Sequence, residues 1–278
     1  MVTGMPSFRV VDAFTDRPFA GNPAAVLVLD GGYDPAWAQR VAAEFNLSET
    51  AFLRPADDPG AHYELRWFTP VTEVSLCGHA TLAAAHALFE EGAKWLADPA
   101  GPIRFRTLHS GVLTVRRQDG LLWMDFPAHA PVATDVPEGL ERVLGTQPVR
   151  TALGGTGDLL VEVAGESVLR GLTPDIPGLG AFAERGVIVT AAASAGAAHA
   201  FASRFFAPNA GVPEDPVTGS AHTVLAPYWA ERLGRRAFEA VQCSARTGRL
   251  WLDLPTDPPG RVRIGGAAVT VTRGELLA

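Results

Sequence analysis

The sequence contains little of what marks several large classes of proteins. Its 278 residues include two cysteines, Cys77 and Cys243, which lie far apart and show no metal-ligand spacing. Lysine and arginine total 23 against 30 aspartates and glutamates, which gives a net charge of -7 without any basic cluster. Nucleic-acid-binding surfaces are typically basic, so we expect no nucleic acid as a partner.

A long apolar segment is also missing. The longest apolar run, residues 80–89, is interrupted by a histidine and is too short to cross a bilayer. The N-terminus has no basic region followed by an apolar one, which is the pattern of a secretory signal. We therefore expect a cytoplasmic protein with no membrane partner. The hydrophobic share of 47% is enough for sizeable cores and argues against disorder.

Familiar catalytic signatures are absent as well. The sequence has no G-x-S-x-G, no phosphate-binding loop, and no G-x-G-x-x-G after a strand. The glycine-rich stretch at residues 154–157 lacks the lysine and the helix that a phosphate loop needs. The seven histidines form no pair of metal ligands at i and i+4. These absences leave no sign of a phosphate-binding cofactor site, and we expect no metal.

What the sequence does contain is a repeated unit. Residues 66–70 (RWFTP) precede a glycine turn at residues 77–79 (CGH), which opens an apolar run. Residues 204–208 (RFFAP) precede a second glycine turn at residues 218–220 (TGS), which opens a similar run. Each copy ends in a Trp-x-Asp-x-Pro motif. We interpret the chain as two copies of one structural unit.

The repeat predicts two domains, residues 1–128 and 129–278, with the last strand free to return to the first domain. A helix that is apolar on all sides is buried on all sides, so each sheet is expected to curl around the helix that follows its glycine turn. The proline- and alanine-rich segment 127–137 is the expected linker, and residues 191–200 are expected to form a loop. Hydrophobic periodicity predicts further helices at 35–45 and 140–144, and strands at 7–14, 24–29, 50–53, 63–69, 103–108, 112–117, 121–126, 159–163 and 186–190, with a strand pair at 262–271.

Glu49 is the first candidate for chemistry. It lies at a predicted helix-to-strand junction, between the apolar residues Phe45, Leu47 and Phe52. A carboxylate in such surroundings has a raised proton affinity and can carry a proton near neutral pH. The alternative is a solvated loop glutamate, and position alone favours that alternative.

The two glycine turns, at Gly78 and Gly219, are the second candidates. Each opens a predicted helix, whose first backbone N–H groups and dipole form an anion site. Such a site can hold a carboxylate or stabilise an enolate that forms when a proton is removed. Close packing at a strand–helix turn is the alternative, and two turns at equivalent positions argue against it.

Three further side chains could take part. His79 can exchange a proton near neutrality, although it could equally cap the helix. Asp215, between a glutamate and a proline, could orient a substrate amine or hydroxyl, or simply form a turn. Cys77 could act as a thiol base, or it could be a small buried hydrophobic residue. The second half has Thr218 at the position of Cys77, so a pair of thiol bases is not available.

Four blocks of sequence carry a resemblance to a known family. They are VDAF with GNP at residues 11–14 and 21–23, NLSET at 46–50, LCGHAT at 76–81 and EDPVTGSA at 214–221. In order and spacing they resemble the signature blocks of the PhzF-like family of phenazine biosynthesis, across essentially the whole chain. The resemblance implies an α+β, diaminopimelate-epimerase-like fold of two similar domains. Each would be a curled, mainly antiparallel sheet around a central helix.

The resemblance also implies an activity. Members of the family are isomerases without a cofactor, commonly homodimers, with an active site between the domains where a glutamate moves a proton between carbons of the substrate. A small carboxylate-bearing substrate is therefore expected. Matching the blocks residue by residue gives Glu49, His79 and Asp215 as catalytic residues, and Asn22, Gly78, Thr218, Gly219 and Ser220 as substrate-binding residues.

Diaminopimelate epimerase itself is a weaker match, because it takes one cysteine from each half. Cys77 matches the first position, but Thr218 stands at the second. Two other hypotheses therefore stay beside the leading one. The first is an epimerase of amino or hydroxy acids with Cys77 as one base. The second is a metabolite-binding or interaction protein without catalysis on the same scaffold.

Overall fold

The computed structural model describes residues 5–92, 98 and 101–277 of the chain. It divides into two compact units. Unit 1 consists of Met1–Asp125 and Gly265–Ala278, and unit 2 consists of Phe126–Ile264. Both ends of the chain therefore belong to unit 1, which unit 2 interrupts. Among the residues described, no helix has the length and apolar character needed to span a membrane.

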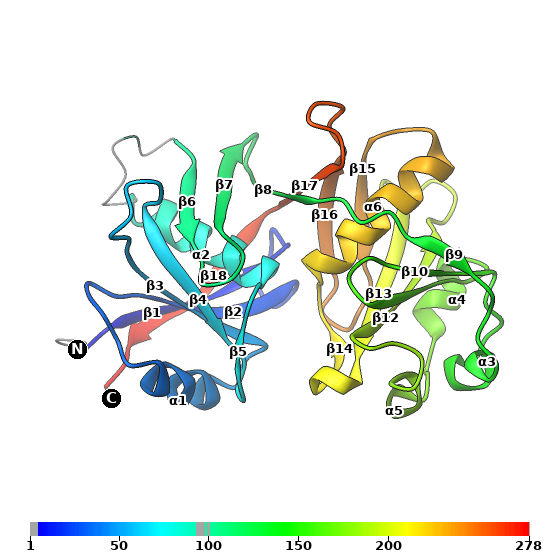
Figure 1. Ribbon diagram of the computed structural model, residues 1–278, viewed down its shortest axis with the longest axis horizontal. Coiled ribbons are helices and arrows are strands. Elements are labelled where there is room, and N and C mark those ends of the chain that lie inside the picture. Colours follow the sequence, from blue (N-terminus) through cyan, green and yellow to red (C-terminus); the bar gives the residue numbers. More distant parts are fainter. Residues whose placement is uncertain (1–4, 93–97, 99–100, 278) are drawn as a thin grey trace. The chain divides into compact units, whose positions relative to one another are not determined.

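Unit 1 is built on a mixed sheet (Figure 1). Its strands are hydrogen-bonded in the order β18, β1, β2, β3, β4, β6, β7 and β8, with β5 beside β4. Of these pairs, β2–β3 and β4–β6 are parallel, and the others are antiparallel. The strand bounds are β1 (Ser7–Ala13), β2 (Asn22–Val28), β3 (Glu49–Pro55), β4 (Tyr63–Phe68), β5 (Glu73–Val74), β6 (Ile103–Arg106), β7 (Val112–Gln118), β8 (Leu121–Pro127) and β18 (Ala268–Glu275).

Two helices accompany this sheet. The helix α2 (Gly78–Glu90) contacts β1, β2, β3 and β18, and it is buried along almost its whole length, as its all-round apolar sequence predicts. The amphipathic helix α1 (Pro35–Phe45) instead packs on β3 and β4. Asp34 caps its first turn by accepting a hydrogen bond of 3.0 Å from the backbone N–H of Ala36. It ends where Asn46 turns left-handed, with φ of 50°.

The strands of unit 2 form parallel and antiparallel pairs, and the unit has an apolar core. Its helices α3 (Leu140–Leu144), α4 (Glu166–Gly171) and α5 (Ile176–Leu179) bury leucines against β11, β12 and β13. The longer helix α6 (Gly219–Leu233) packs through Trp229, whose indole N–H donates to the Thr190 hydroxyl at 3.0 Å and whose ring stacks on Phe201. The strands are β9 (Val132–Thr134), β10 (Arg150–Leu153), β11 (Asp158–Glu162), β12 (Gly186–Ala192), β13 (Phe201–Ala207), β14 (Val212–Asp215), β15 (Ala237–Gln242), β16 (Gly248–Asp253) and β17 (Arg261–Gly266).

The two units repeat one pattern of strand pairing. In unit 1, β2 pairs parallel with β3, β3 antiparallel with β4, β4 parallel with β6, and β6 antiparallel with β7. In unit 2, β11, β12, β13, β15 and β16 follow the same sequence of parallel and antiparallel pairs. Each unit then places one long helix after a glycine turn. The repeat in the sequence is thus a repeat of topology.

An arginine clamp occurs at the same place in both units. Arg66 of β4 donates to both carboxylate oxygens of Glu73 in β5, at 2.6 and 2.7 Å. Arg204 of β13 does the same to Glu214 in β14, at 2.7 and 2.9 Å. Two parallel hydrogen bonds fix both position and orientation. Each clamp therefore holds the short strand that leads into a glycine turn, which explains why the arginines recur in the repeat.

Several sequence-based predictions of local structure were incomplete. The segment 127–137 was predicted as a linker, but it contains β9, which pairs with β10. The two strands predicted within 262–271 are present as β17 and β18, and β18 extends to Glu275 and pairs along its length with β1. The predicted loop at 191–200 begins only after β12 ends at Ala192. The short elements β5, β14, α4 and α5 were missed, because two to six residues show no clear periodicity.

Candidate functional site

The strand register of unit 1 brings the first candidate residues together. The strands β2 and β3 are parallel and in register from Ala24 and Glu49 onward. Asn22, which begins β2, and Glu49, which begins β3, therefore lie at the same edge of the sheet. The helix α2 packs on both strands, and His79 is its second residue. The elements β2, β3 and α2 thus begin close together, and each carries a polar side chain in its first two residues: Asn22, Glu49 and His79.

The side chains there form a chain of contacts centred on His79. Its Nε2 lies 3.2 Å from Oε2 of Glu49, and its Nδ1 lies 3.2 Å from the amide nitrogen of Asn22. Cys77 Sγ lies 3.5 Å from the same Nδ1. Because an amide nitrogen can only donate, this arrangement assigns Nδ1 as the acceptor. The proton of a neutral ring is then on Nε2, the nitrogen beside the carboxylate of Glu49.

Burial sets the charge of this ring. His79 is 4% exposed and Asn22 is fully buried, while the Glu49 side chain keeps 18% of its surface exposed. Desolvation lowers the pKa of His79 to about 3, so the imidazole is neutral at physiological pH. A neutral N–H beside the carboxylate can orient it without neutralising it. The exposed part of Glu49 is the part of this cluster that solvent or a small molecule can reach.

The glycine turn beside the cluster has the geometry of an anion site. Cys77 is the N-cap residue of α2, has an extended backbone, and makes no capping hydrogen bond with its side chain. Its carbonyl oxygen accepts hydrogen bonds from the backbone N–H and the hydroxyl of Thr81, at 3.2 and 2.6 Å. The N–H groups of the first helical turn have no acceptor within the helix and carry the positive end of its dipole.

The equivalent turn of unit 2 holds the remaining predicted residues. Asp215 ends β14, and its carboxylate accepts a hydrogen bond from the hydroxyl of Thr218. Gln242 of β15 accepts from the backbone N–H of Thr218 at 2.8 Å and donates to the carbonyl oxygen of Asp215 at 2.7 Å. The Ser244 hydroxyl reaches the same carbonyl at 3.1 Å. Side chains of Gln242 and Ser244 thus hold the backbone of the turn at Asp215 and at Thr218.

The predicted residues thus fall into two groups, one in each unit. The group in unit 1 consists of Asn22, Glu49, Cys77, Gly78 and His79. The group in unit 2 consists of Asp215, Thr218, Gly219 and Ser220. Sequence reasoning missed Gln242 and Arg185, which donates to Ser220. Neither belongs to a block of the resemblance, because both come from strands or loops remote in sequence from the turn they contact.

The donor set in unit 1 also has the composition of a metal site. Ligand atoms of Glu49, Cys77 and His79 all lie within 4.8 Å of one another. Thiolate, imidazole and carboxylate are the ligands that zinc takes in proteins. The sequence-based expectation of no metal stays a prediction.

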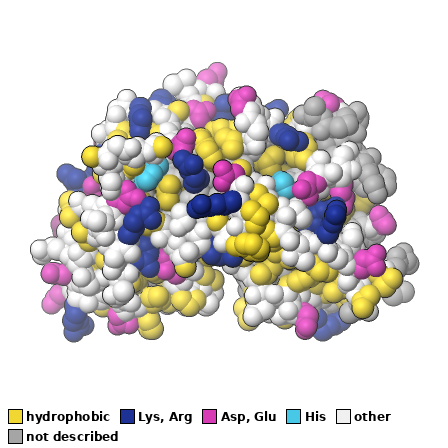
Figure 2. Space-filling model, turned by 180° about the vertical axis from the view of Figure 1, so that it is seen from behind, with side chains coloured by type: hydrophobic (Ala, Val, Ile, Leu, Met, Phe, Trp, Pro, Cys, Tyr) yellow, Lys and Arg dark blue, Asp and Glu magenta, His cyan; other side chains and the backbone are white. Residues whose placement is uncertain are grey.

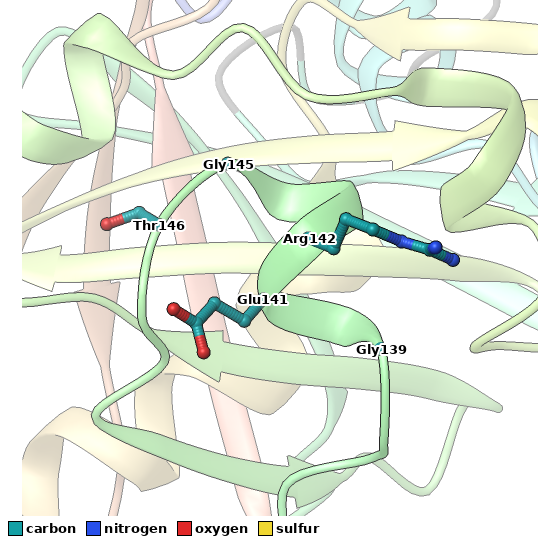
Figure 3. Close-up of a pocket in the computed structure, with 5 residues that line it drawn as sticks. All are labelled: Gly139, Glu141, Arg142, Gly145 and Thr146. Atoms are coloured by element: carbon teal, nitrogen blue, oxygen red, sulfur yellow. The ribbon is translucent and has the colours of Figure 1, made fainter.

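A hollow of about 450 Å³ lies beside α3 on the surface of unit 2 (Figure 3). Its lining residues are Gly139, Glu141, Arg142, Gly145 and Thr146. Figure 3 shows the side chains of Glu141 and Arg142 pointing in different directions, so they do not converge on one point. Glu141 instead accepts from Gln147 at 3.3 Å. On the face shown in Figure 2, acidic and basic side chains are interspersed, and no patch of one charge stands out.

Two units with one strand pairing, each placing a helix after a glycine turn, define a protein of the epimerase-fold class. Known structures agree. A PhzF-family protein of Enterococcus faecalis superimposes with a TM-score of 0.90 at 38% identity, over 99% of this chain and all of that chain. A hydroxyproline epimerase from Agrobacterium vitis reaches a TM-score of 0.64 at 14% identity, over 98% of this chain and 92% of that one, and thus shares the fold alone.

Sequence comparisons identify the family. The family model described as "Phenazine biosynthesis-like protein" matches residues 11–274. A Pseudomonas aeruginosa protein named as an uncharacterized isomerase is 48% identical over 269 residues, which cover 97% of each chain. The chain belongs to the phenazine biosynthesis-like, or PhzF, family and is an isomerase. The predicted family and the predicted fold class are confirmed.

Proposed function

We propose that the protein moves a proton between carbon atoms of a small carboxylate-bearing substrate, with Glu49 as the proton carrier. The observation that supports this proposal most is the contact of 3.2 Å between Glu49 and the buried ring of His79. A carboxylate beside a neutral N–H, rather than a cation, can act as a general base that takes a proton from carbon. It can then return that proton to another carbon of the same substrate.

His79 orients the carboxylate in this proposal. With a pKa of about 3, the ring is neutral above pH 4, so it presents an N–H to Glu49 but does not itself deliver a proton near neutrality. Asn22 fixes the ring tautomer by donating to Nδ1. The Gly78 turn, at the positive end of α2, stabilises negative charge that develops on the substrate when its proton leaves.

Asp215, Thr218, Gly219 and Ser220 are assigned to substrate binding in unit 2. The turn offers backbone N–H groups and a serine hydroxyl, which suit a carboxylate, and the carboxylate of Asp215, which suits an amine or hydroxyl. A cytoplasmic location, a homodimer and the absence of a cofactor stay predictions.

Solvent exchange tests the assignment of Glu49. The protein is incubated in deuterated water with a panel of small amino and hydroxy carboxylic acids, and loss of C–H signals is followed by NMR. With an acid that exchanges, Glu49→Gln should slow exchange by at least about 100-fold, the typical contribution of a general base. The exposed Glu44 of α1 supplies the matched control, Glu44→Gln, which should exchange at the wild-type rate. Exchange at the native rate in Glu49→Gln would refute the proposal.

One alternative has an observation in its favour. Cys77 Sγ lies 3.5 Å from His79 Nδ1, so a thiol base beside the ring is possible and would suit an epimerase. Cys77→Ala separates the two mechanisms. An epimerase that uses the thiol loses turnover in this variant, whereas a carrier mechanism through Glu49 keeps near-native exchange.

A further inference from the structure

The hydroxyl of Ser220 is held by an arginine that lies outside the sequence blocks of the family. Arg185 stands immediately before β12, and its Nη1 donates to Ser220 Oγ at 3.0 Å. Its Nη2 donates a hydrogen bond to the carboxylate of Asp158. The backbone N–H of Arg185 donates to the carbonyl oxygen of Gly157 at 3.3 Å. Both the side chain and the backbone of Arg185 are thus anchored in unit 2.

The surroundings leave the guanidinium little freedom. Asp158 is fully buried, and a buried carboxylate is costly without a charged partner, so Arg185 is retained beside it. The guanidinium carbon lies 5.1 Å from the centre of the Phe205 ring. Gly186 makes room for that ring, because a Cβ at this position would come within 2.5 Å of Phe205 Cζ. The position of the guanidinium is therefore set by neighbours on three sides.

This contact decides which way the serine hydroxyl can act. A hydroxyl has one proton to donate, and its oxygen accepts. Since Arg185 donates to Oγ of Ser220, the serine proton remains available to a ligand. Ser220 is the second residue of α6, where the first-turn N–H groups and the helix dipole also favour an anion. All of these groups present donors.

We infer that Arg185 is a positioning residue, which holds Ser220 as a hydrogen-bond donor to the carboxylate of the substrate. The inference rests on the substrate-binding role proposed for Ser220. It predicts that this turn binds a charged carboxylate in preference to a neutral amide of the same shape. Lysine cannot replace Arg185, because one ammonium group lacks the planar fork that reaches Asp158 and Ser220 together.

Acetate and acetamide provide the test, since they have the same shape and only acetate is charged. Each is titrated at constant ionic strength, and the amide signals of Gly219 and Ser220 are followed by NMR. The wild-type protein should show a saturable shift with acetate and none with acetamide. Ser220→Ala and Arg185→Lys should each weaken acetate binding by about tenfold. Since Arg185 acts through Ser220, the double variant should bind no more weakly than Ser220→Ala alone.

Three results would overturn the inference. They are no saturable shift with acetate in the wild type, acetate affinity of Arg185→Lys within twofold of wild type, or losses that multiply in the double variant. A merely structural role for Arg185 would give the multiplied losses. If circular dichroism shows that Arg185→Lys does not fold, the charge-balanced variant Asp158→Asn/Arg185→Met takes its place under the same criteria. The titration does not involve Glu49, so its failure is distinguishable from failure of the exchange experiment.

Discussion

The buried ring of His79 gives the sharpest test of the proposed site, through the variant Asn22→Asp. Asparagine and aspartate have nearly the same shape, but the amide donates to Nδ1 and a carboxylate can only accept. In the variant, the ring lies between two acceptors, the carboxylate introduced by the substitution and that of Glu49. Only the imidazolium form can donate to both, so the pKa of His79 should rise.

The size of the effect follows from the hydrogen bonds involved. A hydrogen bond to a charged group contributes roughly 1.5–3 kcal/mol, which corresponds to about one to two pKa units. The pKa of His79, about 3 in the native protein, should therefore rise by about one to two units. The variant Asn22→Leu is the control, since it removes the donor without adding an acceptor, and it should leave the pKa low.

NMR of the ring nitrogens of His79 measures both its tautomer and its pKa, and it needs no substrate. Spectra of the native protein at pH 7 should show a neutral ring protonated at Nε2, and an acid titration gives the pKa in each variant. Native His79 protonated at Nδ1 at pH 7, or an unchanged pKa in Asn22→Asp, would refute the hydrogen-bonding scheme on which the orientation of Glu49 depends.

Three further predictions concern stability. Burial lowers the pKa of His222 to about 4, below its unfolded value near 6.5, so the unfolded chain binds more protons in this range. As the pH is lowered from 6.5 to 4, the free energy of unfolding should therefore fall by up to about 1.4 kcal/mol per pH unit. Chemical denaturation should show a weaker dependence of this free energy on pH for His222→Asn. Arg204→Met leaves the partly buried Glu214 without its clamp and should cost about 1–3 kcal/mol, whereas the paired variant Arg204→Met/Glu214→Gln should recover part of the loss in the same assay. Gly186→Ala places a methyl group within 2.5 Å of Phe205 and should lower thermal stability by about 1–3 kcal/mol, while alanine at the unobstructed Gly171 should cost less than about 1 kcal/mol.

The architecture was predictable because the chain repeats it. Arg66 and Arg204 occupy the same place in the two copies and have the same structural role. Each forms hydrogen bonds with a glutamate in the short strand before a glycine turn. The all-round apolar run after Gly78 predicted a buried helix, and α2 is one. Elements of two to six residues, such as α4, escaped prediction because they are too short for a periodic pattern.

The contacts of the site were less predictable than its residues. Glu49 and His79 were selected separately, but no pattern in the sequence shows that their side chains lie 3.2 Å apart. That contact depends on the parallel register of β2 and β3 and on the packing of α2 over them. Arg185 could not be found at all, because its contact with Ser220 joins a loop to a helix 35 residues further along the chain.

The pairing of β18 with β1 bears on how the chain folds during synthesis. β1 precedes unit 2 in the chain and its partner β18 follows unit 2, so all of unit 2 is synthesised between the two paired strands. Unit 2 is continuous and can form first, whereas pairing β18 with β1 carries the entropic cost of a contact between strands that are separated by all of unit 2. Until then β1 is an unprotected edge, open to pairing with another nascent chain. Loss of the C-terminal strand should therefore lead to aggregation of the N-terminal unit rather than to simple fraying of its end.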